Sequence, residues 1–271
     1  MQTALINNAR IAYRLDGPTG APVVMLSNSL MSTHVMWDPQ IDALLGHYRV
    51  LRYDMRGHGE SETTPGPYSI ASLTDDAAAL IDVLGVGPVH FAGLSMGGMI
   101  GQQLGARYPD KVLSLSLCDT ASEMPPREVW EARFATARAK GIPGLVEDTI
   151  KRWFVPGFVE REPQTIAWVR KMILTTGTEG YIACGSAVRD MSQTHLLGSI
   201  RVPTQIIVGR DDPACTLAAS KVLHQGIPGS VLHVIDDAAH LSNIEKPRQF
   251  TELLLTFINA QAQRAAQGKG A

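Results

Sequence analysis

The sequence has few of the features that mark a secreted or metal-binding chain. It holds three cysteines in 271 residues, Cys118, Cys184 and Cys215, an odd number without the spacing of a metal site. We therefore expect buried, unpaired thiols in a reducing cytoplasm. The first residues lack a basic segment followed by an apolar one, so no secretory signal is expected.

Long apolar runs and a charge excess of one sign are also missing. Apolar runs such as residues 23–26 are strand-sized and far below the roughly 18 to 20 residues of a membrane span. The formal net charge of −2 gives no basic surface for nucleic acid or anionic lipid. With 45% hydrophobic and 18% charged residues the chain is globular, and the expected partner is a small molecule rather than nucleic acid or a membrane.

What is present is an alternation of short β-branched segments with segments of helical period. This alternation is typical of a mostly parallel sheet flanked by helices. Eight strands are predicted, at residues 3–7, 11–15, 23–27, 49–53, 89–93, 112–118, 204–208 and 231–235. Helices are predicted at residues 70–84, 97–108, 217–225 and 246–260. The predicted fold class is therefore α/β.

The alternation stops between residues 121 and 199. This stretch is rich in Arg, Glu and Trp at helical spacing and is broken at Gly141-Ile-Pro-Gly144. We interpret residues 121–199 as a helical cap inserted into one core, formed by residues 1–120 and 200–260. Residues 261–271 are polar and alanine-rich, which predicts a flexible tail.

The strongest chemical signal is Gly93-Leu-Ser-Met-Gly97, a G-x-S-x-G motif between a predicted strand and a predicted helix. A turn this sharp strains its central residue, and side chains two positions to either side would collide with neighbouring strands. Ser95 would then project at the carboxyl end of the sheet, where the helix dipole favours a developing anion. The pattern predicts a nucleophile at Ser95 in an α/β-hydrolase fold; the alternative is a glycine-rich structural turn.

A serine nucleophile needs a base, and the base needs a carboxylate to orient it. Of the eight histidines, His240 lies between the last predicted strand and the last helix, in a loop that can reach Ser95. His58 lies in a tight turn between glycines and is expected to be structural. Two adjacent aspartates, Asp211 and Asp212, follow the preceding strand, which gives the chain order Ser, Asp, His of this fold.

The reaction also needs N–H groups directed at the oxyanion. One is expected from the backbone of Met96, which follows the nucleophile, and the other from the loop after strand 23–27. The sequence contains neither an H-x-x-x-H pair nor a G-x-G-x-x-G run. We therefore expect neither a metal nor an organic cofactor.

Several motifs together resemble the 3-oxoadipate enol-lactonases, α/β-hydrolases of the β-ketoadipate pathway that open an enol-lactone to 3-oxoadipate. The matching segments are Ser27-Asn-Ser-Leu30, Met36-Trp-Asp-Pro-Gln40, Val50-Leu-Arg-Tyr-Asp54, Arg56-Gly-His-Gly59, Thr64-Pro-Gly-Pro-Tyr-Ser69 and Gly93-Leu-Ser-Met-Gly-Gly98. The resemblance covers residues 10–120 and resumes at 200–250. It departs from the family at Met31, where glycine is expected, and at Ala214-Cys-Thr216.

This resemblance implies roles for further residues. It favours Asp212 over Asp211 as the acid, because the family places the acid three residues after a glycine. It implies that the second oxyanion donor is Leu30, since the preceding Asn28-Ser29 occupies the place of a His-Gly pair in many relatives. It also implies a small anionic lactone as substrate, whose carboxylate needs a cationic partner in the pocket.

The predicted cap offers five cations for this role. They are Arg127, Arg133, Arg138, Lys151 and Arg152. Arg133 is favoured because Trp130 and Phe134 flank it, and a mixed apolar and cationic lining suits such a ligand. Trp153 is a candidate aromatic wall. The alternatives are solvated surface charges and aromatic side chains that pack the cap on the core.

Other functions remain open at this stage. A broad-specificity carboxylesterase or a cofactor-free perhydrolase would use the same three residues, and preference for p-nitrophenyl acetate over the enol-lactone would indicate it. A carbon–carbon bond hydrolase is less favoured, because the G-x-S-x-G motif of such enzymes usually carries Asn at the position of Leu94. A non-catalytic binding protein of this fold usually lacks a member of the triad, whereas Ser95, Asp212 and His240 are all present.

Overall fold

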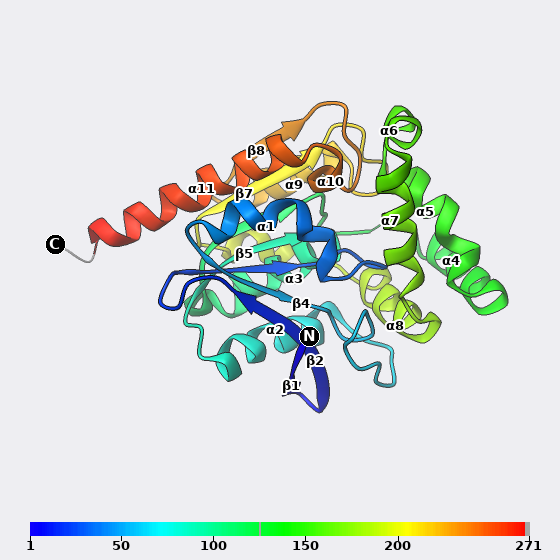
Figure 1. Cartoon of the computed structure of the whole chain (residues 1–271), viewed down its shortest axis with the longest axis horizontal. Coiled ribbons are helices and arrows are strands. Elements are labelled where there is room, and N and C mark those ends of the chain that lie inside the picture. Colours follow the sequence, from blue (N-terminus) through cyan, green and yellow to red (C-terminus); the bar gives the residue numbers. More distant parts are fainter. Residues whose placement is uncertain (125, 269–271) are drawn as a thin grey trace.

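The computed structural model describes residues 1–124 and 126–268, which form one eight-stranded sheet flanked by helices (Figure 1). The strands are β1 (Gln2–Ile6), β2 (Ala9–Asp16), β3 (Val23–Ser27), β4 (Arg49–Tyr53), β5 (Val89–Leu94), β6 (Val112–Cys118), β7 (Thr204–Gly209) and β8 (Val231–Ile235). Each predicted strand is present, with its ends within two residues of the predicted ones. The predicted α/β fold class is confirmed.

The strand order is β1-β2-β4-β3-β5-β6-β7-β8. Strands β1 and β2 are antiparallel to each other, and β2 is antiparallel to β4, whereas the pairs from β4 through β8 are parallel. All residues of β3, β5 and β7 are buried. Because helices cover both faces of a parallel sheet, such strands are nearly continuous apolar runs. Strand β5 lies between β3 and β6, so its carboxyl end is central.

Helices outside residues 121–199 flank the sheet (Figure 1). They are α1 (Asp38–Leu45), α2 (Ile70–Leu84), α3 (Met96–Arg107), α9 (Leu217–Gly226), α10 (Ser242–Glu245) and α11 (Pro247–Gly268). α1 contacts α11, and α2 contacts α3. In the described part of the chain, no helix combines the length and the apolar character that crossing a membrane requires.

Helix α11 is longer than its predicted range, residues 246–260. It continues to Gly268, and its buried face, which includes Phe250, Leu254 and Ile258, extends to Gln261. The predicted flexible tail, residues 261–271, is therefore helical as far as Gly268. Residues 269–271 lie outside the described residues.

Among the described residues, five α-helices fall between β6 and β7, within the predicted cap range 121–199. They are α4 (Arg127–Lys140), α5 (Val146–Trp153), α6 (Pro156–Arg161), α7 (Pro163–Leu174) and α8 (Thr178–Arg189). Figure 1 shows them gathered at one end of the sheet, opposite the end of α11. Aromatic contacts join α4 to α8: the ring centroids of Phe134 and Tyr181 lie 5.9 Å apart.

The turn after β4 touches α8 backbone to backbone. A Cβ atom added at Gly180 would lie 1.9 Å from the carbonyl oxygen of Gly57, which has a φ of +81°. The N–H of Tyr68 also donates to the carbonyl of Ala183, at 3.2 Å. Only glycine permits so close an approach, so this turn of the core and α8 are held in a fixed relation.

His90 on β5 is a buried titratable group whose pKa makes the stability of the fold depend on pH. It is buried with its Nδ1 2.8 Å from Ser114 Oγ, and burial lowers the pKa of the imidazole from 6.5 to about 4. Between pH 4 and pH 6.5, His90 binds a proton in the unfolded chain but not in the folded chain. The stability contributed by neutral His90 is therefore present above pH 6.5 and lost as the pH falls to about 4, by roughly 3 kcal/mol.

We predict that His90→Asn, which does not titrate, removes this loss. Urea unfolding of both proteins at pH 7 and at pH 4.5 measures the difference in their free energies of unfolding. That difference should shift in favour of the variant by about 2 kcal/mol at the lower pH. An unchanged difference would contradict a neutral, buried His90.

Candidate active site

Ser95 lies in the turn between β5 and α3 with φ 55° and ψ −115°, a region that side chains rarely adopt. Its N–H donates to the carbonyl of Cys118 at 2.9 Å, and its own carbonyl accepts the hydroxyl of Thr120 at 2.7 Å. Both partners belong to the end of β6 and the residues after it. Hydrogen bonds to the neighbouring strand thus hold the strained conformation in place.

Two glycines make this turn possible. A Cβ atom at Gly97 would lie 2.2 Å from the carbonyl oxygen of Ser27 in β3, and one at Gly93 would lie 2.1 Å from the carbonyl oxygen of Gly97. A side chain at either glycine would therefore collide with the backbone, as the motif predicts. At Gly97 the collision is with a neighbouring strand, as expected, whereas at Gly93 it is with the start of α3.

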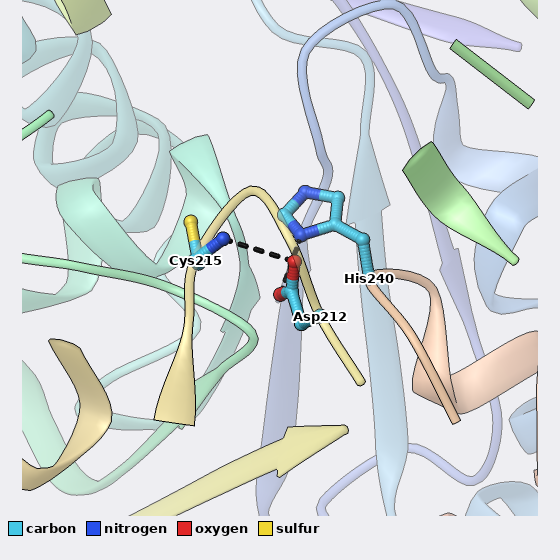
Figure 2. Close-up of side chains that lie close together, drawn as sticks. All are labelled: Asp212, Cys215 and His240. Atoms are coloured by element: carbon cyan, nitrogen blue, oxygen red, sulfur yellow. Dashed lines mark hydrogen bonds and ion pairs between the residues drawn. The ribbon is translucent and has the colours of Figure 1, made fainter. Parts of the chain in front are cut away.

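His240 lies in the loop between β8 and α10, and its Nδ1 is 2.8 Å from Asp212 Oδ2 (Figure 2). The other carboxylate oxygen accepts the N–H groups of Ala214 at 2.7 Å and Cys215 at 2.9 Å. Because the carboxylate accepts at Nδ1, the proton is on Nδ1 and Nε2 is free to accept. Asp211 is exposed and does not contact His240 in the described residues.

Ser95 and His240 line the same pocket, at the carboxyl end of β5. Both are largely buried, with 8% and 3% of their surfaces exposed. In the described residues no hydrogen bond joins Ser95 Oγ to the imidazole. Such bonds are often long before substrate binds and shorten in the reacting complex. The fold therefore brings the predicted nucleophile, base and acid into one cluster.

Asp212, Cys215 and His240 also satisfy a distance criterion for a metal site, since one potential ligand atom of each lies within 4.8 Å of the others (Figure 2). Their chemistry does not fit a metal. The carboxylate already accepts three hydrogen bonds. Burial, together with the nearby Asp212, raises the pKa of the Cys215 thiol well above its usual range, whereas a thiol must lose its proton to bind a metal.

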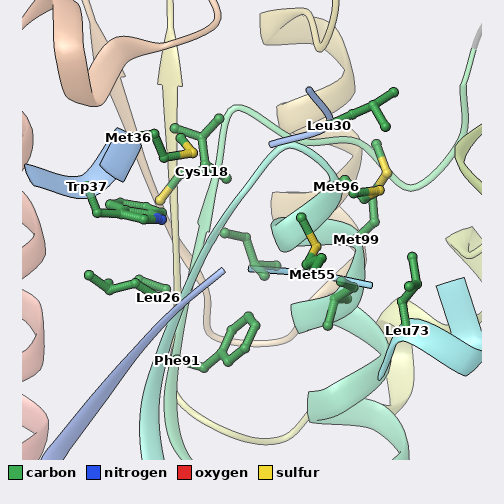
Figure 3. Packing of buried hydrophobic residues seen from close by; sticks show 14 of the residues in the cluster. Leu26, Leu30, Met36, Trp37, Met55, Leu73, Phe91, Met96, Met99 and Cys118 are labelled. Carbon is green, nitrogen blue, oxygen red and sulfur yellow. The ribbon is translucent and has the colours of Figure 1, made fainter. Parts of the chain in front are cut away.

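The two predicted oxyanion donors, Leu30 and Met96, are buried, and Figure 3 shows their side chains. Leu30 lines the same pocket as Ser95, and Met96 directly follows Ser95 in the chain. Met96 is the first residue of α3, so its N–H has no partner within the helix. In the described residues the N–H groups of Leu30 and Met96 donate to no protein acceptor, whereas the next N–H along the loop, that of Met31, donates to His58. In the described residues, the backbone N–H groups of Leu30 and Met96 are thus free to donate to a ligand near Ser95.

Asn28 anchors the loop that carries Leu30. Its side-chain amide donates to the carbonyl of Tyr53 at 2.8 Å, and its side-chain oxygen accepts the indole N–H of Trp37 at 3.1 Å. Met31 has a φ of +64°. This left-handed backbone explains why glycine is expected at that position in the family.

The cap helices form the other wall of the pocket. They and the preceding segment contribute Met124, Trp130, Arg133, Thr149, Arg152, Trp153, Tyr181 and Val188. Of the five predicted cations, Arg133 and Arg152 line the pocket. Arg127 instead pairs with Asp190 at 2.9 Å, and Arg138 and Lys151 are exposed.

The two arginines of the pocket have no carboxylate partner among the described residues. An Nη2 hydrogen of Arg152 is donated to Thr149 Oγ1 at 3.2 Å, and the Arg133 guanidinium lies 5.1 Å from the centre of a Trp130 ring. Burial, and next the charge of Arg133, lower the pKa of the Arg152 guanidinium. Two half-buried cations that lack an ion-pair partner among the described residues could bind an anion in this pocket.

Both predicted tryptophans line the pocket as well. The Nε1–H of Trp130 is buried and has no hydrogen-bond partner in the described chain. The carbonyl of Trp153 accepts the N–H of Leu241 at 3.1 Å. Trp153 therefore also ties the cap to the loop that carries His240.

Two buried carboxyl groups near Asp212 and His240 were not predicted from the sequence. Glu245 accepts the N–H groups of Ala239 at 2.6 Å and Val155 at 2.8 Å, and burial raises its pKa to about 7. Asp119 lies directly after β6, and burial together with the Asp212 carboxylate raises its pKa well above the usual range. Its position at the carboxyl end of a central strand was the available signal. Glu245 gave none, because both of its partners are backbone groups.

Similarity to known proteins identifies the family of this chain. A family profile described as alpha/beta hydrolase fold matches residues 22–247. The chain is 34% identical over 248 residues to 3-oxoadipate enol-lactonase 2 of Acinetobacter baylyi, covering 92% of each chain. Its structure is similar to the enol-lactonase of Burkholderia xenovorans LB400, with a TM-score of 0.93, 40% identity, and coverage of 95% of this chain and 100% of that one.

A second solved structure shows how far the similarity extends. A thermophilic esterase from Thermogutta terrifontis, solved with malate bound, gives a TM-score of 0.89 at 29% identity and covers 96% of this chain and 99% of that one. The similarity to the enol-lactonases that the motifs indicated is confirmed. The chain belongs to the α/β-hydrolase fold family and is a hydrolase.

Proposed function

We propose that this chain opens a small anionic lactone, 3-oxoadipate enol-lactone, to 3-oxoadipate through an acyl-enzyme on Ser95. The observation that carries the proposal is the pair of guanidinium groups in the pocket of Ser95, Arg133 and Arg152, which form no ion pair with a carboxylate among the described residues. Burying a charge without a partner is costly, so the pair is best explained by an anionic ligand. The enol-lactonases named above support the choice of lactone.

In the first step Nε2 of His240 takes the proton of Ser95 Oγ, and Oγ attacks the lactone carbonyl carbon. Asp212 stabilises the imidazolium through the hydrogen bond at Nδ1. The N–H groups of Leu30 and Met96 donate to the oxyanion, and the amino end of α3 adds its dipole. The substrate carboxylate stays on the arginines throughout.

Collapse of this intermediate breaks the ring C–O bond and leaves the acyl group on Ser95. The leaving enolate oxygen takes the proton from His240, and the enol then rearranges to the ketone, which makes ring opening hard to reverse. A water molecule next gives a proton to His240 and attacks the acyl carbon. The second collapse returns that proton to Ser95 Oγ and releases a carboxylic acid, which loses its proton to solvent and becomes the new carboxylate.

The two adjacent aspartates provide a matched test of the triad. We predict that Asp212→Asn lowers kcat by at least about 100-fold, because an amide would no longer stabilise the Nδ1-protonated imidazolium. Asp211→Asn should keep kcat within twofold of the wild type. Steady-state hydrolysis of the enol-lactone measures both variants, and equal losses in the two would refute the assignment of the acid.

The arginines are tested by substrate charge. We predict that Arg133→Ala and Arg152→Ala each lower kcat/KM for the anionic enol-lactone by roughly 10- to 150-fold, mainly through KM, because a charge-assisted hydrogen bond is lost. Hydrolysis of neutral p-nitrophenyl acetate should change little. Arg138→Ala, an exposed cation of the same helix as Arg133, is the control. Equal effects on both substrates would indicate general damage to the cap instead of anion recognition.

A broad-specificity carboxylesterase is the second candidate, favoured by the similarity to the Thermogutta esterase. A panel of the enol-lactone, muconolactone, simple γ-lactones and aryl esters separates the two functions. The enol-lactonase should show its highest kcat/KM on the enol-lactone. Higher values on the aryl esters would favour the carboxylesterase.

A further inference from the structure

His58 has no part in the mechanism above. It lies outside the pocket and contacts the loop after β3 that carries Leu30 and Met31, here called the oxyanion loop. It lies in the turn after β4, with 1% of its surface exposed. Its Nε2 accepts the N–H of Met31 at 3.0 Å. The histidine expected to be merely structural therefore holds the residue that directly follows the proposed donor Leu30.

Met31 needs such a restraint. Its φ of +64° is unfavourable for a residue with a side chain, so without a restraint the backbone at Met31 would favour another conformation. The hydrogen bond from its N–H fixes the peptide group between Leu30 and Met31. Fixing this peptide limits rotation at Leu30 and so limits the direction of the Leu30 N–H.

The imidazole of His58 is held in the required form. Because Nε2 accepts a backbone N–H, the proton is on Nδ1, beside the carbonyl of Arg56 and 3.7 Å from Cys184 Sγ on α8. Burial lowers the pKa of His58 from 6.5 to about 4. The ring is therefore neutral at pH 7, and Nε2 remains an acceptor.

The same turn is fixed against the cap. Gly57, next to His58, approaches Gly180 of α8 so closely that a Cβ on either residue would lie 3.0 Å or less from the other's backbone. The thiol of Cys184, one turn further along α8, donates to the carbonyl of Arg56 at 3.2 Å. His58 thus lies between a cap helix and the oxyanion loop.

We propose that His58 is a positioning residue of the oxyanion hole, which directs the Leu30 N–H by accepting the N–H of Met31. This inference rests on the proposed function, in which Leu30 donates to the oxyanion formed at Ser95. Loss of an oxyanion donor costs about 100- to 1000-fold in kcat. A donor that is misdirected but still present should cost less, about 10- to 100-fold.

Two polar variants of His58 separate positioning from bulk. In His58→Gln the side-chain oxygen can reach the place of Nε2 and accept from Met31, whereas the side chain in His58→Asn is too short. His90→Asn is the matched control, because His90 is equally buried but lies away from the pocket. Each protein is assayed for kcat and KM on p-nitrophenyl acetate and for its thermal unfolding midpoint.

We expect His58→Asn to lower kcat by about 10- to 100-fold with KM within twofold of the wild type, since the donor acts on the transition state. His58→Gln should recover kcat to within about threefold of the wild type. His90→Asn should keep its kcat even where its unfolding midpoint falls. Phenylboronic acid, which forms a tetrahedral adduct with a serine, should bind His58→Asn more weakly by a factor similar to the loss in kcat.

The role of His58 would be overturned if His58→Asn kept kcat within twofold, or if Gln and Asn at this position lowered kcat equally. It would also be overturned if kcat fell in both His58→Asn and His90→Asn in proportion to their unfolding midpoints. Ser95→Ala separates this inference from the proposed function. Activity retained in Ser95→Ala would refute both, whereas an inactive Ser95→Ala beside a fully active His58→Asn would refute only the role of His58.

Discussion

The active site depends on one close approach, between the turn at Ser95 and the end of β3. The Cβ position of Gly97 is 2.2 Å from the carbonyl oxygen of Ser27, and the N–H of Gly97 donates to the carbonyl of Asn28 at 2.9 Å. This contact brings the first turn of α3 next to the loop after β3. The free N–H of Met96 and that of Leu30 therefore belong to two segments that the backbone itself holds together.

Several energetically costly features lie at the pocket of Ser95. Ser95 and Met31 have strained backbones, the Nε1–H of Trp130 has no partner among the described residues, and Arg152 is half-buried beside Arg133. All of these residues line this pocket, although strained or unsatisfied groups also occur elsewhere, as at Asn7 and at His90 on β5. Such local conflicts are expected where a protein is organised for chemistry rather than stability alone.

Hydrogen bonds connect the loop that carries His240 to the cap. The N–H of Leu241, next to His240, donates to the carbonyl of Trp153, and Glu245 accepts N–H groups from Ala239 and from Val155 of the cap. The loop that carries His240 is thus held from the cap on both sides of the imidazole. The same hydrogen bonds therefore link the helices over the pocket to the loop that carries His240, the predicted base.

The sequence alone determined the strands, because they depend on local periodicity. It also led to the prediction of Ser95 as nucleophile and of the chain order Ser, Asp, His, because G-x-S-x-G has specific steric demands. It could not choose between Asp211 and Asp212 from the residues alone, since neighbours in a loop point in different directions and only the contact with His240 distinguishes them. It placed Arg133 and Arg152 among five cap cations, but which of them face Ser95 depends on how the helices pack over the sheet. The roles of Glu245 and His58 could be read only from the tertiary structure, because their partners are backbone N–H groups distant in sequence, which leave no pattern in the side chains.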